Sequence, residues 1–216
     1  MSPPRSPIPK VHVKTFGCQM NDLDSAKMLW LLELDGWEST PEPADADALL
    51  INTCTVREKP AHKVVSLLGR YREIKQHRPS VRIVVTGCYA VQEGKRLLRS
   101  HPEVDAVVGP DAVARIGDVL RRTAAARFVD TGEGDDGGFS DEPVFRSSRR
   151  VTALVAIQRG CDHGCTYCIV PSVRGNERYR SPDDVLREVD QLVDGGAREL
   201  TLLGQNVNRY RGRDAN

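Results

Sequence analysis

The stretch Ala48-Leu-Leu-Ile-Asn-Thr-Cys54 decides the fold of the first half of this chain, because a short apolar run ends directly at a cysteine. Two other stretches repeat this pattern, Lys10-Val-His-Val-Lys-Thr-Phe-Gly-Cys18 before it and Arg82-Ile-Val-Val-Thr-Gly-Cys88 after it. Apolar runs of this length, bounded by turn residues, predict buried strands. The residues between them leave room for one helix each, so the pattern predicts an α/β fold with a parallel sheet and right-handed crossovers.

Each of these three strands ends at a cysteine, so Cys18, Cys54 and Cys88 are expected at the same carboxyl edge of the sheet. Open α/β sheets bind ligands in the crevice at that edge. Three separately buried cysteines are the alternative, since free cysteine is among the most buried residue types. We interpret the triplet as a three-thiolate metal site, because packing alone does not explain why all three follow strands.

Helices are expected between and after these strands, over residues 21–35, 57–76, 88–99 and 111–126. A short fourth strand is predicted over 104–108. The sequence therefore predicts a disordered lead-in at 1–9 and a four-stranded parallel βα domain over 10–127. The acidic, glycine-rich composition that follows indicates a flexible linker over 128–150.

A second group of cysteines stands in Arg159-Gly-Cys-Asp-His-Gly-Cys-Thr-Tyr-Cys-Ile169. The C-x3-C-x2-C spacing supplies three thiolates, from Cys161, Cys165 and Cys168, whereas a structural zinc or an ordinary four-iron cluster takes four protein ligands. Three ligands leave one iron open to a small molecule, which is the arrangement found in radical S-adenosylmethionine (SAM) enzymes. Half of a zinc site, or a disulfide beside a spare thiol, is the alternative.

The segment around this loop predicts the start of a (β/α) barrel. An apolar strand over 151–157 leads into the loop, and Ser181-Pro-Asp-Asp184 has the N-cap, proline and acidic first turn that begin a helix. That helix is expected to end at Gly195-Gly196, before a strand over 199–203. Such barrels place their chemistry in the loops after the strands, but a whole barrel takes about 200 residues or more. Residues 151–216 are therefore predicted to be the beginning of a truncated barrel.

Bulk composition excludes several classes of protein. The net charge is +1 over 216 residues, so charge alone does not point to nucleic acid. No apolar run approaches the ~18–20 residues that span a bilayer, and the first residues lack the apolar core of a signal peptide. We therefore expect a cytoplasmic protein without membrane contact, whose six cysteines stay reduced and serve as metal ligands.

Together these motifs resemble the methylthiotransferase family, radical-SAM enzymes with two four-iron clusters. The resemblance covers residues 10 to 210 and rests on the three-cysteine loop together with Gly17-Cys-Gln-Met-Asn21, Asp24-Ser25, Asn52-Thr-Cys-Thr-Val-Arg-Glu58 and Gly87-Cys88. The tRNA-modifying branch is the most similar, on the basis of Val170-Pro171, Arg174-Gly-Asn-Glu177 and Gly204-Gln-Asn-Val-Asn208. That branch adds a methylthio group to C2 of N(6)-isopentenyladenosine beside the anticodon.

The resemblance implies roles for the candidate residues, although it identifies no catalytic residue. The cluster of the three-cysteine loop would be the site where SAM yields a radical, and the cluster of the strand-end cysteines would handle the sulfur. Tyr167 is a candidate contact to the SAM adenine, with ordinary packing as the alternative. Gly204 and Gln205 would offer backbone groups to the SAM amino group. Arg174 and Arg180 are expected in solvent, with contact to phosphate or to the SAM carboxylate as the alternative. His163 is expected behind the metal ligands or in solvent.

The implied partners of a full-length enzyme are the tRNA anticodon stem-loop and an electron donor, with the enzyme a monomer or weak dimer. The present chain is expected to be inactive in tRNA methylthiolation, because it encodes only the first two strands and one helix of the barrel. Its second segment should be disordered, docked on the first, or buried in a dimer contact. Two alternatives stay open. One is a branch that acts on threonylcarbamoyladenosine or a ribosomal-protein aspartate, and the other is a non-catalytic iron–sulfur or zinc module that binds RNA or a partner.

Overall fold

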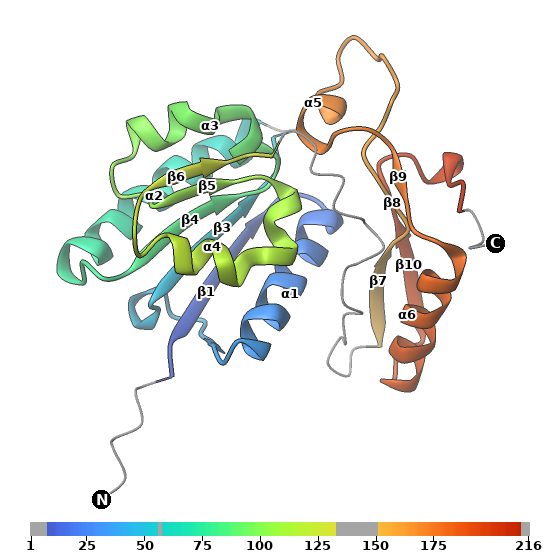
Figure 1. The fold of residues 1–216 in the computed structure, drawn as a ribbon, viewed down its shortest axis with the longest axis horizontal. Coiled ribbons are helices and arrows are strands. Elements are labelled where there is room, and N and C mark those ends of the chain that lie inside the picture. Colours follow the sequence, from blue (N-terminus) through green and yellow to red (C-terminus); the bar gives the residue numbers. More distant parts are fainter. Residues whose placement is uncertain (1–7, 56–57, 133–150, 213–216) are drawn as a thin grey trace, which may run out of the picture.

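The computed structural model describes residues 8–55, 58–132 and 151–212. Figure 1 shows a larger unit, in which helices cover both faces of a sheet, beside a smaller unit formed by the second half of the chain. The sheet of the larger unit has six strands in the order β2-β1-β3-β4-β5-β6, and every neighbouring pair is parallel. The expected α/β fold with a parallel sheet is therefore confirmed.

The strands of this sheet are short, and all of them run in one direction. Their bounds are β1 (Lys10–Phe16), β2 (Glu38–Ser39), β3 (Ala48–Thr53), β4 (Arg82–Thr86), β5 (Ala106–Val108) and β6 (Phe128–Asp130). The connecting helices are α1 (Gln19–Leu34), α2 (Glu58–His77), α3 (Cys88–Ser100) and α4 (Ile116–Arg122), with 3-10 turns η1 (Pro43–Asp45) and η2 (Pro110–Arg115).

Two strands were missed in the sequence, so the expected count of four was wrong. Strand β2 is two exposed residues, and β6 is three half-buried residues at the other edge of the sheet. Both are edge strands with a neighbour on one side only. They are therefore less buried than the central strands, and neither forms an apolar run. Since β6 pairs with β5, the parallel sheet continues to Asp130, beyond the predicted end of the βα domain at 127. The rest of the expected linker, 133–150, and the lead-in at 1–7 lie outside the described residues.

Two helix boundaries also differ from prediction. Helix α1 begins at Gln19, where the Cys18 carbonyl accepts from the backbone of Asn21 and Asp22, so neither of these is the cap. The Asn21 side chain is engaged elsewhere, with Asn52. The single helix expected over 111–126 is instead η2 followed by α4, which ends at Arg122.

The side chains of each central strand alternate between two apolar layers. Leu49 and Ile51 of β3 face α2 and α3, whereas Leu50 packs with α1 and α4 on the opposite face. All six residues of β3 are buried, as expected for a strand covered on both sides. The carboxyl ends of β1, β3 and β4 are therefore held by cores on both faces, which positions the residues that follow these strands.

The smaller unit is a fragment of sheet with a helix on one face. Its elements are β7 (Thr152–Ala156), β8 (Gln158–Arg159), α5 (Val170–Arg174), β9 (Arg178–Tyr179), α6 (Pro182–Asp194), β10 (Glu199–Leu203) and the 3-10 turn η3 (Val207–Arg209). Strands β7 and β10 are parallel neighbours, and β8 pairs with β9 antiparallel. The helix start at Ser181 is confirmed, because the Ser181 hydroxyl accepts from the Asp184 backbone at 3.1 Å.

The two units share helix α1. Met20 and Leu23, at the start of α1, form a buried cluster with Ala156 of β7 and Leu203 of β10. The other face of the β7–β10 pair packs against α6, through Val155 and Leu192 for example. Of the three expectations for the second segment, the structure shows the one in which it is docked on the first.

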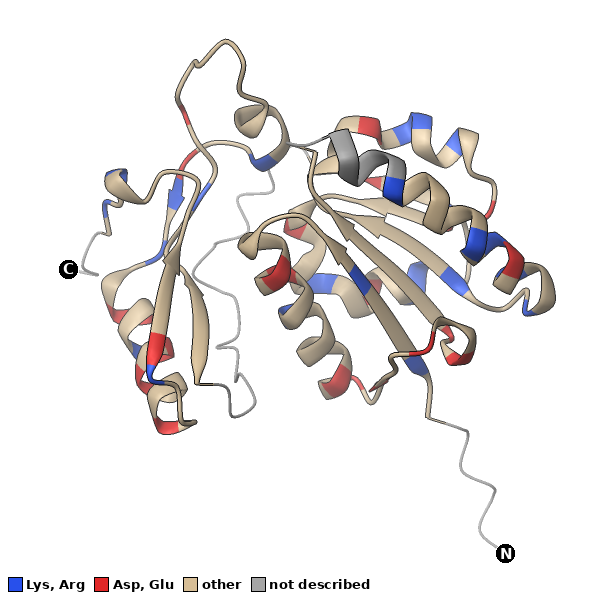
Figure 2. Cartoon of the chain, turned by 180° about the vertical axis from the view of Figure 1, so that it is seen from behind, with Lys and Arg blue, Asp and Glu red and all other residues tan. Residues whose placement is uncertain are grey.

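Acidic and basic residues are mixed over the surface, without a large region of one sign. Figure 2 shows acidic and basic residues interleaved over the helices of the larger unit, and acidic residues along α6. This agrees with the net charge of +1. Among the described residues, no helix has both the length and the apolar character needed to cross a bilayer.

Candidate metal centres

The three strand-end cysteines meet at one edge of the sheet. In the strand register Phe16 lies opposite Thr53, and Asn52 lies opposite Thr86, so the three strands end level with one another. Cys18, Cys54 and Cys88 follow directly at this edge, which we call the thiol edge. The predicted placement at a shared carboxyl edge is therefore confirmed.

Two glycines allow the chain to pass closely at the thiol edge. A Cβ on Gly17 would lie 2.7 Å from Cys54 Cβ, and a Cβ on Gly87 would collide with the Thr53 carbonyl oxygen. Gly87 also has φ of +93°, a conformation that other L-residues rarely adopt. These glycines let the loops after β1 and β4 approach the loop after β3, and so draw the thiols together.

The thiols of the thiol edge differ in their acidity. A side-chain hydrogen bond with Cys54 lowers the pKa of the Cys18 thiol to about 5, against the opposing effect of burial. Cys18 also donates to Asn21 Oδ1 at 3.3 Å. Burial raises the pKa of Cys88, although the nearby Arg174 guanidinium opposes this shift. Cys18 and Cys88 interact electrostatically, which supports their closeness.

Arginines from the smaller unit reach into the thiol edge. Arg174 Nε lies 3.1 Å from Cys88 Sγ, and its Nη1 lies 2.9 Å from the Asp24 carboxylate of α1. Arg159 Nη2 approaches the other oxygen of Asp24 at 3.1 Å. Burial lowers the pKa of Arg174, but Asp24 and Cys88 together raise it above its ordinary value. The two units are thus joined by charged hydrogen bonds as well as by apolar packing.

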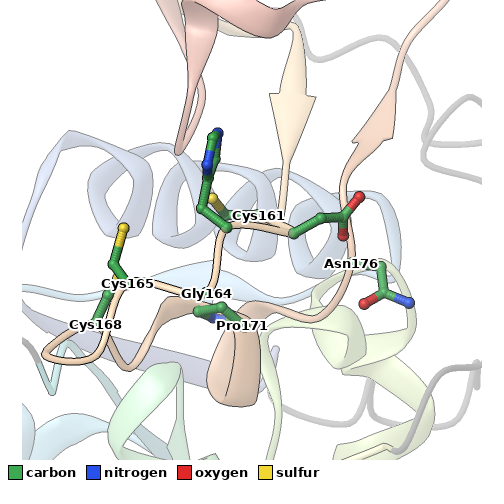
Figure 3. Close-up of a pocket in the computed structure, with 8 residues that line it drawn as sticks. Cys161, Gly164, Cys165, Cys168, Pro171 and Asn176 are labelled. Atoms are coloured by element: carbon green, nitrogen blue, oxygen red, sulfur yellow. The ribbon is translucent and has the colours of Figure 1, made fainter.

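The C-x3-C-x2-C loop borders a cavity of about 580 Å³. Figure 3 shows Cys165 and Cys168 close together on one turn of the loop and Cys161 apart from them, near β8. The Cys168 backbone N–H donates to the Cys165 carbonyl at 3.0 Å, which closes that turn. Cys161 is buried, Cys168 is half-buried and Cys165 is exposed. All three line the cavity, so the loop presents its thiols to one open space.

A different trio near this cavity is close enough to hold a single ion. Among the described residues, this group consists of Cys161, His163 and Glu177. Their ligand atoms lie within 4.8 Å of one another. Arg209 lies beside this trio, with its Nη1 3.2 Å from His163 Nε2 and its Nε 3.6 Å from a Glu177 oxygen. The guanidinium thus already supplies a positive charge where an ion would lie, which disfavours a small cation.

The residues proposed to contact SAM lie in different surroundings. The Gln205 side chain accepts from the Gly160 backbone at 2.7 Å, directly before the cysteine loop. Gly204 passes close to Gln158, where a Cβ would lie 2.7 Å from its side-chain oxygen. Tyr167 is 90% exposed and is not among the residues that line the cavity. The structure therefore joins Gly204 and Gln205 to the stem of the loop and leaves Tyr167 in solvent.

The arginines expected in solvent are buried. Arg180 is 4% exposed and pairs with the buried Glu188 of α6, while Arg174 is 6% exposed. Asp24 and Arg159 were not identified as site residues from the sequence, although Asp24-Ser25 is part of the motif quoted above. A buried acid on α1 can be recognised from helical periodicity, because Asp24 lies four residues from Met20 and four from Met28, both buried. The partners of Asp24 cannot be recognised in this way, because Arg159 and Arg174 lie more than a hundred positions away in the sequence.

Both cysteine groups fit a sulfur-ligated metal cluster by the chemistry of their donors. Each offers three free cysteines, and the six include no disulfide. The thiolate is the form that binds metal, so a Cys18 pKa below neutrality suits ligation. Each group also provides three thiols rather than four, which leaves one position of a four-iron cluster for a ligand outside the protein.

Family models match two separate parts of the chain. Residues 10–109 match the uncharacterized protein family UPF0004, and residues 155–215 match the radical SAM superfamily. A tRNA-2-methylthio-N(6)-dimethylallyladenosine synthase of Syntrophobacter fumaroxidans is 47% identical over 209 residues, which is 95% of this chain and 46% of the relative. Synthases of the same name are 49% identical over 206 residues in Burkholderia multivorans (94% and 45%) and 46% identical over 215 residues in Anaeromyxobacter sp. (97% and 45%). The chain thus spans about half the length of the curated relatives it matches.

Proposed function

Since this chain matches the amino-terminal portion of the radical-SAM tRNA methylthiotransferase family, we propose that it belongs to an enzyme that adds a methylthio group to tRNA. The proposed substrate is N(6)-isopentenyladenosine beside the anticodon, and the site of addition is C2. The names of the relatives support this choice of branch over those that act on threonylcarbamoyladenosine or a ribosomal-protein aspartate. The partners would be tRNA and an electron donor in the cytoplasm.

The observation that carries the proposal is the juxtaposition of two three-cysteine sites. Cys18, Cys54 and Cys88 follow three neighbouring parallel strands, and Arg174 links that edge to the unit that carries the cysteine loop. We propose that Cys161, Cys165 and Cys168 hold one [4Fe-4S] cluster and that the strand-end cysteines hold a second. Reduced by the electron donor, a cluster held by these thiolates would supply the electron that generates a radical from SAM.

The residues around the two sites would orient and shield this chemistry. Gln205 fixes the backbone at Gly160, and Gln158 accepts from Asn206 at 3.0 Å, so the two loops that would flank SAM are tied together. The cavity beside the cysteine loop gives a small molecule access to the thiols. Apolar docking of α1 on β7 and β10 excludes water between the units. We also propose a domain that begins at residue 10 and a domain over 151–216, with the expected end of the first domain moved from 127 to the end of β6 at Asp130.

Metal analysis of the anaerobically reconstituted chain tests the proposal. Iron and acid-labile sulfide in equal amounts, near eight of each per chain, are expected for two cubic clusters of four irons and four sulfides. Incubation with SAM and a reductant should then release 5′-deoxyadenosine. Zinc without sulfide would instead favour the second candidate, a non-catalytic module that binds RNA or a partner. In that case the zinc would be held by Cys161, His163 and Glu177, whose ligand atoms lie within 4.8 Å of one another, against the opposing charge of Arg209.

A further inference from the structure

Arg174 occupies an unusual position between the two proposed centres. It ends helix α5, shortly after the C-x3-C-x2-C loop, yet its guanidinium contacts residues of the larger unit. Its Nε lies 3.1 Å from Cys88 Sγ, and its Nη1 lies 2.9 Å from Asp24. The side chains of Arg174 and Asp24 are 4% and 1% exposed. Through this one side chain, the loop of one site is tied to a thiol of the other.

Arg174 lies between two acceptors from the larger unit. One side of its guanidinium pairs with the Asp24 carboxylate, and its Nε points at the sulfur of Cys88. Burying a charge without a counter-charge is costly, so a buried guanidinium favours anions beside it. A thiolate that binds metal would supply such an anion at Cys88.

We propose that Arg174 is a positioning residue that couples the two centres. It donates to Cys88 Sγ while that sulfur is a metal ligand, and its pairing with Asp24 fixes the cysteine loop relative to the thiol edge. The proposal deepens the proposed function and rests on it, because it takes Cys88 as a ligand. Hydrogen bonds to the sulfurs of a cluster, together with local charge, set the reduction potential of the cluster. The coupling is therefore measurable without turnover.

Reduction potentials measured on the full chain test the coupling. The cysteine loop is first disabled by replacing Cys161, Cys165 and Cys168 with alanine, so that the signal comes from the thiol edge alone. In this background Arg174→Gln should shift the potential to more negative values, because a positive donor is lost. Asp24→Asn should shift it to more positive values, because a buried negative charge beside Arg174 is removed. Arg174→Lys should lie between the parent and Arg174→Gln.

A matched control separates this effect from a general loosening of the contact between units. Arg178 also bridges the units, through Asp111 at 2.9 Å, but this ion pair is partly exposed and contains no sulfur. Arg178→Gln should leave the potential at the parent value. Opposite shifts in Arg174→Gln and Asp24→Asn support the proposal, since structural damage would move both in one direction. Equal shifts, or no shift in Arg174→Gln, would overturn it.

A second measurement, on the metal-free chain, keeps the test independent of cluster assembly. Amide hydrogen exchange at Gly175, whose N–H donates to the Pro171 carbonyl at 3.1 Å, reports on the anchoring of α5. Arg174→Gln should accelerate that exchange at least tenfold over Arg178→Gln. If the parent chain binds no iron–sulfur centre, the proposed function fails, whereas the anchoring role is then decided by the exchange alone. Unchanged exchange in Arg174→Gln would refute that role.

Discussion

Asn21 and Asn52 bind each other reciprocally at the thiol edge. Asn21 Nδ2 donates to Asn52 Oδ1 at 2.9 Å, and Asn52 Nδ2 donates to the Asn21 carbonyl oxygen at 2.9 Å. Asn52 Nδ2 also lies 2.9 Å from the Ser25 hydroxyl, and both asparagines are at most 1% exposed. This pair connects the end of β3 to the first turn of α1, so it sets the position of the loop that contains Cys18.

Asn52→Leu should therefore destabilise the folded chain while keeping a side chain of similar size. The substitution leaves the buried amide of Asn21 without its acceptor, which costs about 1–3 kcal/mol. Urea unfolding of the metal-free chain, monitored by circular dichroism, measures the loss. The exposed Asn208 is the control, and its replacement by leucine should change stability by less than about 0.5 kcal/mol. Equal effects at the two positions would show that the buried pair contributes nothing specific.

Gly87→Ala should lower stability more than Gly36→Ala does. Both glycines have positive φ, +93° and +84°, and the ψ of −170° at Gly87 adds a backbone conformation that is essentially restricted to glycine. Only at Gly87 does the added Cβ meet the Thr53 backbone, whereas nothing lies within 4 Å at Gly36. The extra loss at Gly87 from strain and overlap together should be about 1–3 kcal/mol. Thermal unfolding of the two variants in parallel measures this difference, and indistinguishable midpoints would contradict it.

Ser181→Ala should weaken the start of helix α6. The Ser181 hydroxyl accepts from the Asp184 backbone N–H at 3.1 Å, which is the usual N-cap contact. Its loss should cost about 1 kcal/mol in the free energy of unfolding. Ser181→Asn, which can also cap a helix, should restore most of the stability. A variant with asparagine as unstable as the alanine variant would show that the hydroxyl acts in some other way.

The contribution of Asp184 to the free energy of unfolding should depend on pH. A hydrogen bond from Ser181 lowers the pKa of the Asp184 carboxyl, despite the opposing effect of partial burial. Because the folded-state pKa is depressed, the carboxylate stabilises the fold above the unfolded-state pKa of about 3.9. That stabilisation is lost as pH falls through the folded-state pKa. The stability difference between the parent and Asp184→Asn, followed by urea unfolding from pH 7 downward, should therefore persist to about pH 4 and then shrink.

Cys165→Ala should remove about half of the iron from the reconstituted chain and leave the absorbance of the other centre. Cys165 belongs to the exposed loop, and the thiol-edge cysteines lie on different elements, so the two groups share no ligand. Cys54→Ala should give the reverse pattern, with release of deoxyadenosine from SAM retained. Iron determination together with EPR of the reduced samples distinguishes the two. Loss of all iron from either variant would mean that the sites do not assemble independently.

The sequence predicted correctly those elements that follow from a local pattern of residues. The apolar runs before Cys18, Cys54 and Cys88 located three adjacent strands, and the parallel topology then placed their ends together. The start of α6 was equally predictable, because its capping residues are contiguous. Short edge strands such as β2 escaped detection, since two exposed residues form no periodic pattern.

The contacts between the units could not be predicted in the same way. Arg174 meets Asp24 across 150 positions of sequence, and no local rule pairs such distant charges. An arginine after a surface loop is ordinarily solvated, which is the reason that both Arg174 and Arg180 were expected in water. The burial of Arg174 follows from the docking of the smaller unit on α1, whereas Arg180 is buried inside the smaller unit, where it bonds Glu188 and the Ala156 carbonyl.

The division of helix α1 between two hydrophobic clusters has a consequence for protein engineering. Met28 and Leu32 pack into the core of the larger sheet, whereas Met20 and Leu23 pack against Ala156 and Leu203 of the smaller unit. A chimera that exchanges the second half of the chain between relatives, cut anywhere in 133–150, would retain one parent's Met20 and Leu23 beneath another parent's strands. The first turns of α1 must therefore come from the same parent as the sequence after residue 150, so that the side chains packed between the two units remain complementary.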